Sequence, residues 1–177
     1  MRILDIWMKS FVSDDFIWPR LQAAIRSALI RGAKIEVLIL NPWSPEATRR
    51  ADESKDVLPG VHVHKEMQVC AARIKNFHRE LRTHDFYSST AAHFRVRLHQ
   101  QRPQAAMHEV DNDAYWCFYP LRDISARTEQ MNVKGSSALG KYLGLHFEAL
   151  WDDESTIDIA DWDERAPSAG IVAAADG

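Results

Sequence analysis

The sequence predicts an α/β fold in which a mixed β-sheet is flanked by helices on both faces. The chain opens with a strand, a helix and a second, continuously apolar strand over residues 2–42. A long amphipathic helix is expected over 63–82, and three short strands follow between 93 and 120. Strands that first alternate with helices and then follow one another directly are typical of a mixed sheet with helices on its two sides.

The first unit spans residues 2–42. Residues 2–8 have the pattern of a strand, and 14–31 that of a helix. The helix is predicted because apolar residues recur at every fourth position, at Ile17, Leu21, Ile25 and Leu29. Pro19 fits its first turn, and Gly32 fits the left-handed residue that ends a helix. The run KIEVLILNP (34–42) is typical of a strand covered on both faces, so the unit should have a right-handed crossover.

The later elements follow from similar patterns. Ser44 and Pro45 suit the N-cap and first position of a short charged helix within 43–54. The helix over 63–82 is predicted from spacings of three and four between its apolar residues, Met67, Cys70, Ile74, Phe77 and Leu81. Turns are expected at Pro59-Gly60, Arg102-Pro103 and 111–113, strands at 93–99, 104–111 and 114–120, a polar loop at 121–136 and a last helix at 137–151.

Composition restricts the class of protein. A chain of 177 residues is large enough for one domain, predicted over 1–155, and the acidic, then alanine-rich residues 156–177 are expected to form a flexible tail. The net charge of −3 does not favour nucleic acid, so a polyanion site would need a local cluster of cations. Cys70 and Cys117 lie in apolar patterns that predict buried thiols. Neither a signal peptide nor an apolar run of about 18 residues is apparent, and a cytoplasmic location is expected.

The first candidate site is a set of cationic side chains on one strand. Arg95, Arg97 and His99 share one face of the strand at 93–99, while Phe94, Val96 and Leu98 share the other. Arginine offers a forked pair of donors that suits phosphate. The alternative is an ordinary solvated face whose arginines pair with carboxylates.

The second candidate site is the segment from Asn41 to Arg50. Ligands of α/β sheets favour the carboxyl ends of strands, and helix N-termini attract anions. Arg49 and Arg50 are therefore candidate ligand-binding residues. The segment is not glycine-rich, so it is no phosphate loop of the known type, and the alternative is a plain strand-to-helix connection.

The remaining sequence patterns give weaker indications of a functional site. His62 and His64 share one side of an extended segment, but the sequence places no third metal ligand beside them, and no metal or other cofactor is predicted. The aromatic run at 115–119 suits base stacking, although aromatic residues in a strand usually belong to a core. None of the common nucleophile, phosphate-loop or dinucleotide motifs is present.

One stretch resembles a known family. PQAAMHEVDNDAYWCFYP (103–120) is similar to the core of the phospholipase D-like superfamily, where a strand carries His-x-Lys and four further residues separate that Lys from an Asp. SALIRGAKIEVLILNP (27–42) resembles the helix, turn and buried strand before that motif, and HFEALW (146–151) resembles the final helix. The likeness spans about residues 2–152 and is strongest to short, degenerate members found in bacterial regulators and defence-type genes.

The decisive catalytic positions differ from the family pattern. With Asp111 aligned to the motif Asp, Gln104 stands in the His position and Ala106 in the Lys position. Glutamine cannot form the phosphoenzyme intermediate that the resemblance implies, and alanine cannot neutralise a phosphate charge. His108 lies on the same strand face two residues further on. We expect it to be structural or to contact ligand, with a displaced nucleophile as the alternative.

The sequence therefore predicts a non-catalytic phospholipase D-like module with a regulatory role, which recognises a phosphate-bearing ligand such as a nucleotide, or a protein partner. The alternatives are a divergent phosphodiesterase or nuclease acting through His108, and a purely structural dimerisation domain. The predicted ligand-binding residues are Arg95, Arg97, His99, His108, Arg49 and Arg50. The resemblance also implies a homodimer, with the aromatic strand at 114–120 as a candidate contact.

Overall fold

The protein folds around one seven-stranded mixed sheet. The computed structural model describes residues 1–55, 58, 60–85, 87–102, 104–119 and 129–165. The strand order is β6-β5-β4-β1-β2-β3-β7. β1 (Arg2–Asp5), β2 (Ile35–Leu40) and β3 (Phe94–His99) are parallel, and the other pairings are antiparallel.

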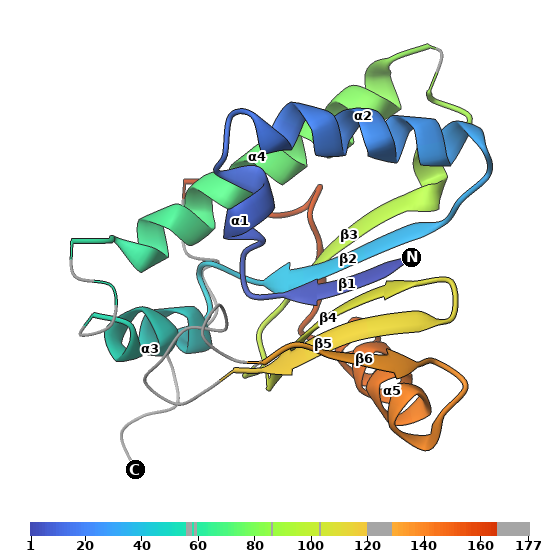
Figure 1. The fold of residues 1–177 in the computed structure, drawn as a ribbon. Helices are drawn as coiled ribbons and strands as arrows, with labels where there is room; N and C mark the ends of the chain where they lie inside the picture. Colours follow the sequence, from blue (N-terminus) through green and yellow to red (C-terminus); the bar gives the residue numbers. More distant parts are fainter. Residues whose placement is uncertain (56–57, 59, 86, 103, 120–128, 166–177) are drawn as a thin grey trace.

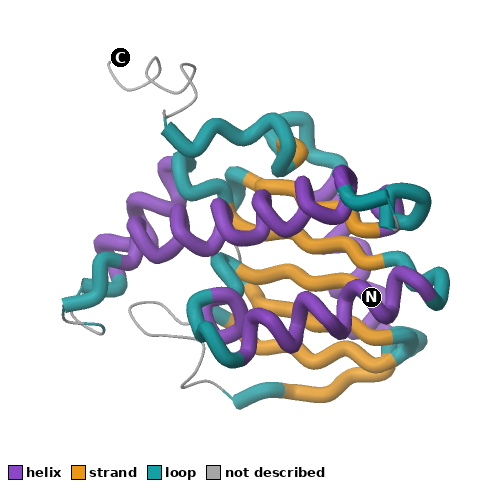
Figure 2. The backbone as a smooth tube through the Cα atoms, turned by 90° about the horizontal axis from the view of Figure 1, so that it is seen from above, coloured by secondary structure: helices purple, strands orange, loops and turns teal. Residues whose placement is uncertain are grey.

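Helices cover both faces of this sheet, which confirms the predicted fold class. α2 (Ile17–Ile30) and α4 (Val63–Thr83) lie on one face, and α5 (Ala138–Trp151) lies on the other (Figure 1). Seen from above, α2 and α4 lie over the sheet and run roughly along the direction of its strands (Figure 2). No helix in the described ranges is both long and apolar enough to cross a bilayer.

The first unit forms as predicted, with one added helix. β1 ends at Asp5, earlier than expected, and Met8 takes the left-handed conformation (φ 54°) that opens the short helix α1 (Lys9–Val12). The parallel pairing of β1 with β2 confirms the strand–helix–strand unit. Gly32, with φ of 82°, follows α2 as predicted.

The helices in the middle of the chain form where the sequence predicted them. The Ser44 hydroxyl accepts a hydrogen bond from the Ala47 amide at 3.1 Å and caps α3 (Pro45–Glu53), whose first residue is Pro45. This satisfies one of the amides that a helix start leaves unpaired. The apolar stripe of α4 is buried as its spacing predicted, and Cys70 and Cys117 are buried thiols outside any disulfide.

The strands that follow include one that sequence patterns did not predict. A short 3-10 turn, η1 (Ala91–His93), precedes β3, and β4 (Ala105–Val110) and β5 (Asp113–Phe118) form the predicted hairpin. β6 (Met131–Lys134) then pairs with β5 inside the span expected to be a loop. Pro59, Pro103, residues 120–128 and residues 166–177 lie outside the described part of the chain.

The expected tail is wrong for residues 156–165. β7 (Ile157–Asp158) pairs with β3 along the edge of the sheet. Beyond it, Ile159 and Trp162 are fully buried and belong to the same core cluster as α2 and α4. The domain therefore extends at least ten residues past its predicted end, because these apolar side chains cover the outer part of the sheet.

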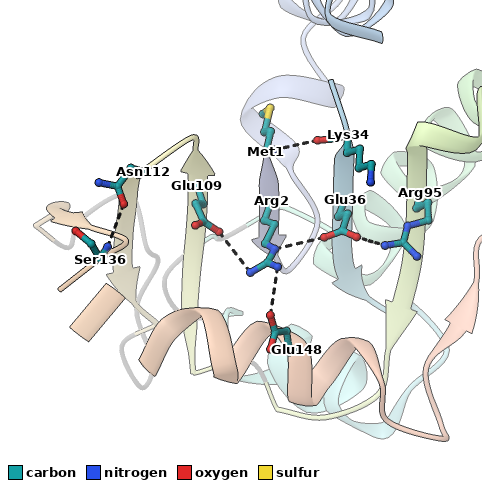
Figure 3. Close-up of polar contacts among 9 residues, drawn as sticks. All are labelled: Met1, Arg2, Lys34, Glu36, Arg95, Glu109, Asn112, Ser136 and Glu148. Atoms are coloured by element: carbon teal, nitrogen blue, oxygen red, sulfur yellow. Dashed lines mark hydrogen bonds and ion pairs between the residues drawn. The ribbon is translucent and has the colours of Figure 1, made fainter. Parts of the chain in front are cut away.

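A charged network stabilises the face that α5 covers. Arg2 projects from β1 and contacts carboxylates on three other elements: Glu36 of β2 at 3.3 Å, Glu109 of β4 at 3.8 Å and Glu148 of α5 at 3.2 Å (Figure 3). Glu36 also pairs with Arg95 of β3. One arginine thus links the centre of the sheet to the helix beneath it.

Candidate functional site

The two arginines of β3 lie on the face that α5 covers, and each has a partner there. Arg95 pairs with Glu36, and its guanidinium carbon lies 5.1 Å from the centre of a Trp151 ring. Arg97 donates to the carbonyl oxygens of Trp151 and, at 2.7 Å, of Thr156. The alternation predicted for this strand is confirmed, and the contacts of both arginines tie α5 and the following segment to the sheet.

His99 ends the same row and is fully buried. Burial lowers the pKa of its imidazole to about 4, so the ring is neutral at physiological pH. A neutral and inaccessible imidazole cannot attract a phosphate from solvent. Ligand binding by these three residues stays a prediction.

The two arginines of α3 lie elsewhere, at the carboxyl ends of the parallel strands. Arg49 pairs with Glu46 and Glu53, and the hydrogen bond with Glu46 is the main reason that its pKa is raised. Arg50 is nearly buried, lies 3.6 Å from Glu53 and stands 5.8 Å from the ring centre of Tyr119. Of the two, Arg50 points toward the sheet.

A pocket of about 230 Å³ opens beside Arg50, where β1 ends. Figure 1 places α1 and α3 on either side of this end of the sheet. The polar lining of the pocket combines two cations with hydroxyl groups and one carboxylate, and the remaining lining residues are apolar. The described lining residues are Asp5, Ile6, Trp7, Lys9, Ser10, Arg50, Ser54, Leu58, Met67 and Tyr119.

A smaller cavity of about 20 Å³ adjoins this pocket and shares Ile6, Arg50 and Tyr119 with it. Arg49 and Arg102 complete its cationic lining, and Arg102 lies 3.9 Å from Glu53. The two hollows together place Arg50 at the centre of the basic groups at this edge. Carboxyl ends of parallel strands are where α/β sheets commonly bind ligands.

Asp5 organises the polar end of the larger pocket. Its Oδ1 accepts a hydrogen bond from the Tyr119 hydroxyl at 2.7 Å and one from the Ile6 amide at 2.6 Å. Burial, and then the Asp5 charge, raise the pKa of Tyr119 well above its usual value, so the phenol keeps its proton and donates. The carboxylate is held in place with its second oxygen left for another partner.

His108, the one predicted site residue on this face of the sheet, faces that second oxygen from beyond hydrogen-bond distance. Its Nε2 lies 3.8 Å from Asp5 Oδ2, and its ring packs edge-on against Phe11 of α1 at 5.6 Å between centroids. Ala106, two residues earlier on β4, is buried on the same face, and Gln104 is exposed just before the strand. Asp111 lies in the hairpin at the other end of β4.

The six predicted site residues therefore fall into three places. Arg95, Arg97 and His99 lie under α5, Arg49 and Arg50 lie on α3, and His108 lies on the opposite face from the first group. Sequence reasoning missed Asp5, Lys9 and Tyr119. The position of Asp5 at the end of the first strand was a usable indication, since that edge is the usual ligand side.

His62 and His64, which the sequence placed on an extended segment, lie at the start of α4. His64 Nε2 contacts the Pro42 carbonyl, and its ring lies edge-on to Trp43 at 5.8 Å. Among the residues that the structure describes, no three metal-ligating side chains gather at one point.

Comparisons with protein-family models, curated proteins and solved structures gave no match to this chain. A proposal about its function therefore depends on the chemistry of the pocket at the end of β1.

Proposed function

We propose that this chain is a non-catalytic binding module of the phospholipase D-like kind, which takes a phosphate-bearing ligand such as a nucleotide in a regulatory role. The observation that carries the proposal is the pocket beside β1, where Lys9 and Arg50 line the same space as Ser10 and Ser54. Ammonium, guanidinium and hydroxyl groups are the donors that recognise phosphate oxygens.

The apolar part of the pocket supports a ligand larger than phosphate itself. Trp7, Leu58 and Met67 form a wall beside the cations, which suits the flat face of a base. Ligand pockets commonly measure roughly 300–1,000 Å³, so a space of about 230 Å³ favours a mononucleotide over a longer chain.

The residues on β4 support binding without turnover. In the register of the resemblance, a glutamine and a buried alanine occupy the positions of nucleophile and charge-neutralising lysine, at Gln104 and Ala106. Neither side chain can attack phosphorus or offset the charge that develops in the transition state. A binding role needs only the cations that the pocket retains.

Lys9→Gln tests the binding role. We expect one member of a panel of nucleoside mono- and triphosphates, with inorganic phosphate as a reference, to raise the melting temperature of the wild-type chain. At a ligand concentration of about 100 times Kd, binding raises the free energy of unfolding by about 2.7 kcal/mol. Lys9→Gln should lose most of this gain, because it removes one of the two pocket cations.

Lys34→Gln is the matched control, since Lys34 is an exposed lysine just before β2, at the far end of the sheet. It should keep the ligand-induced shift. A chain that no nucleotide or phosphate stabilises, or a shift that both variants keep equally, would contradict the proposed site.

The contact between His108 and Asp5 favours a second candidate, a divergent phosphodiesterase. The Asp5 carboxylate, itself held by Tyr119, lies 3.8 Å from the imidazole and is close enough to orient it, as in known acid–base pairs. His108 would then act as base or nucleophile at the edge of the pocket.

Turnover of bis(p-nitrophenyl) phosphate separates the two candidates. On the leading proposal, wild type and His108→Asn release p-nitrophenol at the same background rate. A wild-type rate that falls by about 100-fold or more in His108→Asn, the usual scale of a general base, would instead establish the enzyme. Lys34→Gln again serves as the control for contaminating activity.

A further inference from the structure

Helix α5 has a second apolar face that nothing in the described structure covers. Its buried face, with Leu143, Phe147 and Leu150, packs on the sheet. On the side turned away from the sheet, Tyr142 and Leu145 are 63% and 65% exposed, and Leu139, at the edge of the buried face, is 41% exposed. At 100° per residue, Tyr142 and Leu145 lie in one stripe with Ala138 and Ala149. Single exposed apolar residues are common, but a continuous stripe marks a contact surface.

We propose that this stripe, here called the α5 outer face, binds the same face of a second copy of the chain. The two helices pack antiparallel about a two-fold axis that passes near Leu145. A two-fold contact requires one patch to be complementary to itself, and the charges beside the stripe meet that requirement.

The charges lie on one flank of the stripe. Lys141 and Glu148 are both exposed and stand seven residues apart, which is about two turns, so they share this flank. The midpoint between them falls between Gly144 and Leu145. In an antiparallel pair centred there, Lys141 of each copy lies opposite Glu148 of the other, and the two Leu145 side chains lie on either side of the axis. Opposite charges beside an apolar seam set the orientation of paired helices.

Glu148 is able to take part because its contact with Arg2 does not bury it. The carboxylate lies 3.2 Å from Arg2, yet 52% of its side chain remains exposed. Asp152, one turn beyond Glu148 and also exposed, adds a second negative charge to the same flank. In a parallel pair this flank would face the other flank of the partner helix and Lys141 would not meet Glu148, so the opposite pairs form only in the antiparallel arrangement.

The aromatic strand β5 offers a poorer contact than α5. It lies between β4 and β6 and therefore has no free edge. Its exposed side chains, Tyr115 and Phe118, alternate onto opposite faces of the sheet. The α5 outer face thus replaces residues 114–120 as the proposed dimer contact, and it does not depend on the pocket beside β1.

Sedimentation equilibrium of the full chain over a range of concentrations tests the contact. A single helix pair buries less than the roughly 1,600 Å² of a standard interface, so we expect a dimer with Kd on the order of micromolar. Leu145→Lys should raise Kd at least about tenfold, because it places two ammonium groups at the axis. Its melting temperature should hardly change, since Leu145 is mostly exposed in one copy.

Ile30→Lys is the matched control, because Ile30 is 53% exposed but lies on α2. It should leave the dimer intact. A wild-type chain that remains monomeric up to about 1 mM, far above the Kd expected for this interface, overturns the proposal. So does a dimer that Leu145→Lys leaves unchanged.

Charge exchange tests the antiparallel arrangement. Lys141→Glu alone should raise Kd at least about tenfold, since the carboxylate introduced in each copy would face Glu148 of the other. Adding Glu148→Lys to the same chain restores opposite pairs and should return Kd close to the wild-type value. Thermal unfolding of each variant as a dilute monomer separates this effect from loss of the contact with Arg2. A double variant that stays as weak as Lys141→Glu refutes the arrangement.

Discussion

Trp162→Ala should lower the free energy of unfolding by about 3–5 kcal/mol, the usual cost of removing a large buried aromatic side chain. Trp162 is 1% exposed, and its ring stacks on Trp43 with 6.4 Å between centroids. Lys75 packs over it with the ammonium 6.0 Å from the ring centre. The substitution would leave a cavity that these partners, fixed to α4 and to the segment after β2, cannot close.

Urea denaturation followed by far-ultraviolet circular dichroism measures this loss. Phe16→Ala is the control, because Phe16 is 66% exposed and its removal should cost no more than about 0.5 kcal/mol. A loss below about 1 kcal/mol for Trp162→Ala, well under the usual range, would mean that residues 156–165 are detached from the core in solution.

Acid should destabilise the protein between pH 6.5 and about 4, chiefly through His99. The unfolded imidazole takes up a proton near pH 6.5, whereas burial lowers the pKa of the folded one to about 4. The unfolded state therefore binds more protons in this window, and stability falls as the pH falls through it. Because a tenfold difference in proton affinity corresponds to about 1.4 kcal/mol, the full loss is about 3 kcal/mol.

The titratable groups that face His99 are His146 of α5 and Asp153 just beyond it. Burial also lowers the pKa of His146 and His78, so both add to the loss in the same direction. Hydrogen bonds lower the pKa of Asp14 and Asp153 below 3.8, and their contributions are lost only at lower pH.

His99→Leu should flatten the stability profile, measured by urea midpoints at half-unit steps from pH 7 to about 4, because the main buried titrating group is gone. His62→Leu, which alters an exposed histidine, should keep the wild-type slope. A His99→Leu profile as steep as that of the wild type would assign the acid sensitivity to other groups.

The sequence predicts the long elements of this fold because their patterns repeat. The stripe of α4 covers five turns, and the continuous apolar run of β2 distinguishes a strand covered on both faces. Ser44 and Pro45 locate the start of α3 to the residue. In each case, local chemistry and tertiary burial favour the same structure.

Short elements that depend on distant partners were missed. β6 has only four residues, mostly exposed, and is a strand because β5 lies beside it. Residues 157–162 contain Ile157, Ile159 and Trp162, but seven carboxylates between 152 and 164 make the surrounding composition look like that of a tail. Composition is an average over many residues and hides single positions. Three apolar side chains are nevertheless enough to anchor this segment to the core.

The candidate site is harder to predict because its parts are far apart in the chain. Asp5 and Tyr119 are separated by 114 residues and meet only because β4, followed by β5, returns beside β1. Strand alternation correctly groups Arg95, Arg97 and His99, yet it cannot tell that α5 and Trp151 cover that face. The sequence pattern of a strand shows which residues share one face of the sheet. The topology of the chain determines which other elements pack against that face.

The two-residue strand β7 also protects the protein from aggregation through the edge of its sheet. It occupies the outer side of β3, whose sequence FRVRLH alternates in the way that favours strand addition. A strand edge of this kind, once uncovered, templates the addition of strands from other chains. A molecule cleaved before Ile157 would therefore polymerise through β3 as well as lose stability, so the short C-terminal segment guards the fold against aggregation.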